Sequence, residues 1–153
     1  MMVVWFFLHL LGFTLWLGGG LASMVAGIAG KREDRAGIGA VARTQAAIQK
    51  SIVSPGALLT VLSGLVLTFS VTGRSGETAG FALPLVVMQG AGLLGALITL
   101  LVGLPTASKL ARLDPAGPGA ALFDELRQRQ RLVASLAGVF ALVALVAGAV
   151  YRY

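Results

Sequence analysis

The side chains that could carry chemistry in this chain are few, and they centre on its single histidine, His9. His9 lies in the stretch FFLHLLGFTLWLGGG, residues 6–20, and the first thirty residues contain no Asp, Glu, Lys or Arg. The chain has no cysteine, which excludes disulfides, thiolate metal sites, iron–sulfur ligation and a cysteine nucleophile. Because no second histidine or neighbouring carboxylate is available, we do not expect a complete metal site within one chain.

An ionisable side chain inside an apolar segment is costly unless it has a partner, so His9 is a candidate functional residue. Three roles are open to it. It can be a neutral member of a polar packing layer, which the sequence favours. It can bind haem or copper, alone or together with His9 of a second protomer. It can also belong to a proton path, but the apolar segments contain no carboxylate to continue one.

The surroundings of His9 would suit either close helix contact or a flat ligand. Trp5, Gly12, Phe13 and Trp16 lie at helical spacings from it on one face. At a similar depth, other apolar segments place the polar residues Thr60, Ser63 and Gln89. The predicted cofactor-binding set is His9, Trp16 and Gln89, with His9 as the candidate metal ligand. Two methionines, Met24 and Met88, are possible soft ligands for Cu(I), although methionine is more often a packing residue.

The elements that must position these residues are membrane helices. The composition is 57% hydrophobic and 12% charged, with a mean hydropathy of +0.89. A helix needs about 20 apolar residues to cross the bilayer core. Four segments meet this requirement, which predicts an all-α, polytopic bundle of four transmembrane helices in a single domain. The predicted spans are 3–29, 51–72, 81–105 and 132–151, and the first is expected to be retained rather than cleaved as a signal peptide.

The basic residues predict how the bundle is oriented. All of them except Arg74 and Arg152 lie in two segments, 31–50 and 109–131, which separate the first span from the second and the third from the fourth. Lys and Arg in short loops favour the cytoplasmic side. Both termini should therefore lie outside and both basic segments inside, as in a bacterial inner (plasma) membrane. The basic residues behind the net charge of +6 are then expected to interact with anionic lipid headgroups, and nucleic acid is not an expected partner.

Both basic segments contain helical patterns. In 31–50 the apolar spacing predicts an amphipathic helix that runs into the second span until Pro55 bends it. In 109–131 the sequence AALFDELRQRQR predicts a helix leading into the fourth span, with Glu125 four residues before Arg129. Small residues at intervals of four, as at Gly56, Thr60, Gly64 and Thr68, predict close helix packing or a homo-oligomer.

The first two spans resemble a group of small four-helix bacterial membrane proteins. The resemblance rests on His9, Gly12, Trp16 and residues 18–20, and on SPGALLTVLSGLVL, residues 54–67. The group comprises the copper resistance protein D-like families, the membrane protoporphyrinogen oxidase family and related uncharacterised proteins. The oxidase resemblance implies haem at the first-span histidine. A third-span lysine belongs to that family's pattern, whereas LPLVVMQGAG, residues 83–92, has none, so the uncharacterised members are the most similar.

The sequence thus predicts a non-enzymatic membrane protein. It would act as a bundle or as the subunit of a membrane complex, or it would handle haem or copper with His9 as the candidate ligand. The alternative is a membrane haem-dependent oxidoreductase acting on porphyrin or quinone.

Overall fold

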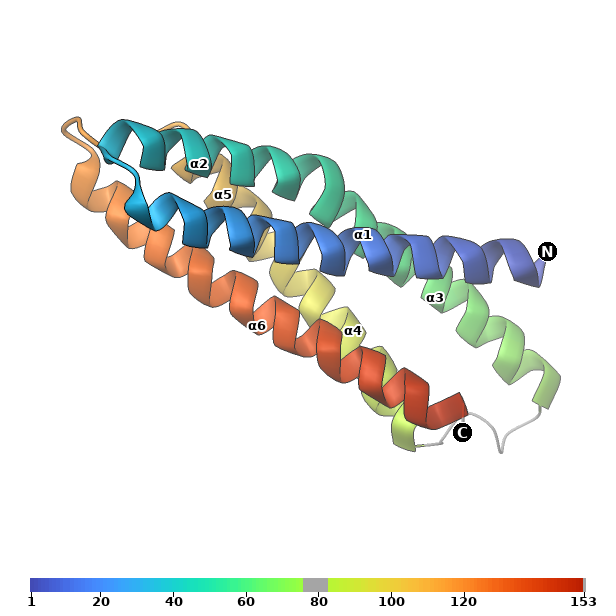
Figure 1. Ribbon diagram of the computed structural model, residues 1–153. Helices are drawn as coiled ribbons and strands as arrows, with labels where there is room; N and C mark the ends of the chain where they lie inside the picture. The colour runs from blue at the N-terminus through green and yellow to red at the C-terminus, as the bar shows by residue number, and fades with distance from the viewer. Residues whose placement is uncertain (76–82, 153) are drawn as a thin grey trace.

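The computed structural model of the chain describes residues 1–75 and 83–152. Within these residues it is all-helical (Figure 1). In chain order the elements are α1 (Met2–Ala29), η1 (Gly30–Arg32), α2 (Arg35–Ile48), η2 (Gln49–Val53), α3 (Ser54–Ser75), α4 (Leu83–Leu97), η4 (Ile98–Gly103), α5 (Leu104–Leu110) and α6 (Ala120–Arg152). Since α2, η2 and α3 follow one another without a break, as do α4, η4 and α5, the elements form four long helical segments.

Each of the four segments is long and apolar enough to cross a membrane. They cover Met2–Arg32, Arg35–Ser70, Leu83–Leu110 and Ala120–Tyr151. This confirms the predicted fold class, an all-α bundle of four apolar helices. The helical segments start before the predicted second and fourth spans, because most of 31–50 and the end of 109–131 are helical. The predicted outer loop falls largely on residues 76–82, which lie outside the described residues.

The two chain termini lie at the same end of the bundle, and the connections at 30–34 and 111–119 lie at the other end (Figure 1). We call these the terminal end and the basic end, because all the basic residues except Arg74 and Arg152 belong to segments near the second one. Large apolar side chains remain exposed on each of the four helical segments, among them Leu21, Leu62, Leu101 and Leu136. Such an exterior requires an apolar surrounding, which the hydrocarbon core of a bilayer provides.

Two prolines explain the irregular turns η2 and η4, which are both π-helical. Pro55 and Pro105 are each the second residue after one of these turns. A proline inside a helix lacks an N–H and its ring collides with the carbonyl four residues earlier. The wider turns relieve this conflict, because Ser54 and Leu104 donate to the carbonyls five residues back, at Gln49 and Thr99. The helices therefore continue through both prolines.

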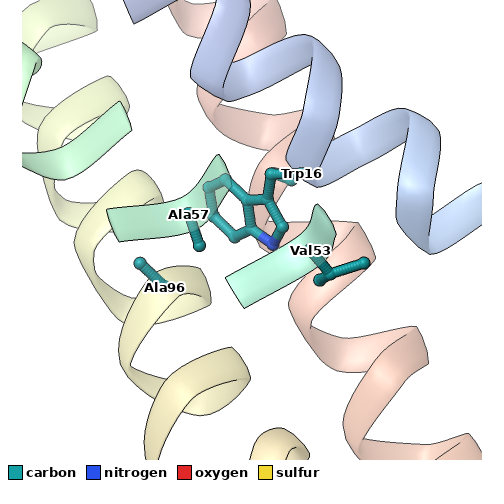
Figure 2. Packing of buried hydrophobic residues seen from close by; sticks show 5 residues of the cluster. Trp16, Val53, Ala57 and Ala96 are labelled. Atoms are coloured by element: carbon teal, nitrogen blue, oxygen red, sulfur yellow. The ribbon is translucent and has the colours of Figure 1, made fainter. Parts of the chain in front are cut away.

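A core of small residues around one tryptophan joins the helices at mid-bundle. Trp16 of α1 is 3% exposed and packs against Val53, Ala57 and Ala96 (Figure 2), and Ala141 completes the cluster. Because the neighbours are mostly alanines, the large indole fills the space that their short side chains leave.

The basic end has a separate apolar cluster that holds α2, α5 and α6 together. Phe123 is fully buried there with Ala42, Leu110 and Leu126. At its rim the guanidinium of Arg35 donates to both carboxylate oxygens of Asp124, at 2.8 and 3.1 Å. The basic end is therefore a packed structure rather than a pair of loops.

Candidate functional site

A large cleft opens between the α1/α3 pair and the α4/α6 pair, in the half of the bundle nearer the terminal end. Its volume is about 1150 Å³, and its lining is mainly apolar. The polar side chains on it are His9, Thr60, Thr68, Gln89 and Tyr151. No Lys, Arg, Asp or Glu is among the described residues that line it. We call it the terminal cleft.

The imidazole of His9 is held by helix α3. Its Nδ1 lies 2.9 Å from the backbone oxygen of Thr60 and 3.3 Å from Oγ of Ser63. Gly64 makes room for the ring, since a Cβ there would lie 3.0 Å from Cε1 of His9. A carbonyl oxygen only accepts hydrogen bonds, so Nδ1 carries the proton. In the neutral ring Nε2 is then an unprotonated acceptor, and it makes no hydrogen bond within the described part of the chain.

Gln89 of α4 reaches the same helix at Thr68, about two turns beyond Thr60 toward the terminal end. Its Nε2 donates to Oγ1 of Thr68 over 2.9 Å, and that hydroxyl donates to the carbonyl of Gly64 over 2.9 Å. Because the Thr68 proton is already given to Gly64, the hydroxyl must accept from the amide. The amide of Gln89 is thereby oriented, with its oxygen directed away from Thr68.

The predicted polar layer is thus assembled in part. The structure brings His9 together with Thr60 and Ser63, as their depths suggested. Gln89 does not bond to His9, but both side chains line the terminal cleft and both are anchored on α3. Sequence depth alone placed them in one layer, whereas their anchors on α3, Thr60 and Thr68, lie about two turns apart.

Trp16 has a different position from His9 and Gln89. It belongs to the mid-bundle core and also lines the inner end of the terminal cleft. Its Nε1 donates to the hydroxyl of Thr99 over 3.1 Å, and Thr99 donates to the carbonyl of Gly95. Phe13 meets the indole edge to face, with ring centroids 6.2 Å apart. Since the indole N–H is used within the bundle, a ligand in the cleft would meet only the ring of Trp16.

Of the methionines that could bind Cu(I), only some line the terminal cleft. Met88 lines the terminal cleft, with its sulfur packed toward Gly148, and Met2 lines it as well. Met24 is 55% exposed and does not contribute to the cleft. Among the described residues, no group of three or more His, Cys, Asp or Glu side chains is placed to hold a metal ion.

A second polar cluster, which the sequence analysis did not identify, lies where the two π-helical turns meet. The amide nitrogen of Gln49 lies 3.4 Å from both Oγ of Ser54 and the backbone oxygen of Thr99. All three residues are buried. The signal in the sequence is a polar residue six before each proline, Gln49 before Pro55 and Thr99 before Pro105, but their contact depends on how the helices pack.

Comparison of the chain with models of protein families, with curated proteins and with solved structures gave no match.

Proposed function

We propose that this protein binds a lipophilic ligand in the terminal cleft, with Nε2 of His9 as the atom that contacts it. The hydrogen bond from Nδ1 of His9 to the carbonyl of Thr60 carries this proposal. Histidines that act as ligands commonly donate their other ring N–H to a carbonyl, which fixes the tautomer and the direction of the ring. His9 also lines an apolar cleft of about 1150 Å³, which has room for a lipophilic molecule beside the ring.

Of the two cofactors that the sequence suggests, haem places the smaller demand on this site. From this chain its iron would need only the imidazole of His9, and the apolar lining would accommodate the flat ring of a porphyrin. When bound, haem would supply electron-transfer chemistry, and His9 would fix the iron and exclude water on that side. Cu(I) would need His9 together with Met88 and Met2, yet the Met88 sulfur packs toward α6 while His9 packs on α3.

The chemistry of the cleft supports binding rather than catalysis. Apart from His9, the described residues that line it include no histidine, carboxylate, Lys or Arg that could pass on a proton taken from a bound molecule. A haem-dependent oxidoreductase acting on porphyrin or quinone is therefore the less favoured function.

The distribution of basic residues supports an orientation in which the basic end faces the cytoplasm and the terminal cleft faces the opposite side. With the basic end in the cytoplasm of a bacterial-type cell, the terminal cleft lies in the outer half of the inner membrane. Ligands would then reach it from the outer leaflet. Association with a second copy or with another membrane protein would leave this entry open if it used the other faces of the bundle.

The test is to purify the protein from membranes in mild detergent and to identify what it retains. Organic extracts are analysed by mass spectrometry, and the visible spectrum reports haem. Wild type and the control Met24→Leu, whose side chain lies outside the cleft, should retain the same lipophilic molecule. His9→Leu should lose it while remaining folded. Identical extracts from wild type and His9→Leu, or a folded wild type that retains nothing, would contradict the proposal.

A further inference from the structure

We infer that the ligand of the terminal cleft is an isoprenoid quinol, the reduced, dihydroxy form of a membrane quinone. This inference rests on the proposed function, since it names the chemical class of the molecule that the cleft binds. It follows from the hydrogen-bonding character of His9 and Gln89, which helix α3 fixes, and from the absence of charge on the described lining.

The first determinant is the acceptor at His9. Its Nδ1–H is committed to the backbone oxygen of Thr60, so Nε2 offers a lone pair and no proton. A ligand hydroxyl can donate to this lone pair. A ligand carbonyl cannot, because two lone pairs would face each other in an apolar cleft. The site therefore distinguishes a quinol from the corresponding quinone at this atom.

The second determinant is the acceptor at Gln89. The chain of hydrogen bonds from Gln89 through Thr68 to the carbonyl of Gly64 fixes which end of the amide faces α3. The amide oxygen is left without a hydrogen bond among the described residues. It offers a second acceptor on the same cleft, and the remaining amide hydrogen can still donate to the oxygen of a ligand hydroxyl.

The two groups are anchored at different depths on the same helix, so a ligand that reaches both must carry two separate hydroxyls. Their anchors, Thr60 and Thr68, are about two turns apart on α3, about 12 Å along the axis. Gly64 lies between them, where its carbonyl accepts from Thr68 and the His9 ring packs against its backbone. Gly64 has no side chain, and the space that this leaves is taken by the His9 ring. The rings of Phe6, Phe13 and Trp16 line the same cleft and can pack against a planar ring.

The charge of the lining selects among lipophilic molecules. A porphyrin with carboxylates, or a phospholipid headgroup, would bring negative charge to a cleft whose described lining has no Lys or Arg. A quinol is neutral, and its isoprenoid tail suits the surrounding leucine and valine side chains. Among neutral membrane lipids it also has two hydroxyls fixed on a rigid ring, so less conformational freedom is lost on binding.

The test uses Trp16 as the reporter. In the purified, detergent-solubilised protein, Trp5→Phe leaves Trp16 as the only tryptophan, and its quenching is titrated anaerobically with three probes. The probes are a quinol with a short isoprenoid tail, the corresponding quinone and the dimethyl ether of the quinol. We expect the quinol to bind about tenfold or more tightly than either of the others, because only the quinol donates to both acceptors.

Two variants and a control test whether His9 and Gln89 cause the preference for the quinol over the quinone. His9→Phe should reduce quinol affinity to that of the quinone, and Gln89→Leu should weaken quinol binding while preserving part of the preference. Met24→Leu should bind as the parent does, and thermal unfolding verifies that each variant is folded. Equal affinities for the three probes, or tighter binding of the quinone, would overturn the inference. If haem or another lipophilic molecule is retained through His9 but quinol is not selected, this inference fails and the proposed function stands.

Discussion

Gly12 of α1 and Gly56 of α3 touch through their backbones where the two helices cross. A Cβ on Gly56 would lie 2.8 Å from the carbonyl oxygen of Gly12 and 2.6 Å from the backbone nitrogen of Trp16. Backbone atoms cannot rotate away as side-chain atoms can. This contact brings α1 close enough to α3 for the His9 ring to reach the carbonyl of Thr60.

Gly56→Ala should therefore force α1 and α3 apart. We expect the free energy of unfolding to fall by about 1–3 kcal/mol, the usual cost of overpacking. Unfolding in mixed micelles measures this. Gly138→Ala is the matched control, because nothing lies within 4 Å of a Cβ at that position. It should be neutral or stabilising by up to about 1 kcal/mol, the helix preference of alanine over glycine. Equal losses in the two variants would show that helix contact is not the cause.

The apolar cluster at the basic end should matter more than the ion pair at its rim. Phe123 is fully buried, so Phe123→Ala should cost about 3–5 kcal/mol of unfolding free energy. The Arg35 and Asp124 side chains are each about half exposed, so Arg35→Gln should lower the unfolding free energy much less than Phe123→Ala, and less still at high salt. The same mixed-micelle unfolding compares the two. A larger loss in Arg35→Gln would mean that electrostatics, not burial, holds α2 against α6.

The proposed orientation is accessible to cysteine labelling, because the natural chain contains no cysteine. Ala36, near the start of α2 at the basic end, and Tyr151, near the terminal end, are both exposed. In intact cells, a membrane-impermeant thiol reagent should label Tyr151→Cys and leave Ala36→Cys unlabelled until the membrane is opened. The reverse pattern would place the terminal cleft in the inner leaflet.

The sequence predicted the polar neighbours of His9 well and those of Gln89 less well. Depth follows from counting residues along a helix, and Thr60 and Ser63 do lie beside His9. Which faces meet depends on how each helix is rotated about its axis, which apolar patterns fix poorly in a membrane because the outside of the bundle is apolar too. For this reason Gln89 meets Thr68 rather than the His9 layer.

The contact of the two π-helical turns illustrates the same limit. Proline predicts a local interruption, and Pro55 and Pro105 each follow a widened turn. Gln49 of one turn contacts the backbone of Thr99 in the other. This contact joins residues far apart in the chain, so it cannot be predicted from the local sequence around either proline.

By itself, the sequence determined the four apolar helices, the common end of the termini and the concentration of basic charge at the opposite end. Length, hydropathy and charge act locally or on the whole chain, so they can be read without knowing which helices touch. Only the tertiary structure decided that α1 pairs with α3 and α4 with α6, and that a cleft opens between the pairs. It also decided that carbonyls of α3 fix the hydrogen-bonding character of His9 and Gln89. These features depend on backbone contacts such as that of Gly12 with Gly56, where a fraction of an ångström determines which helices fit together.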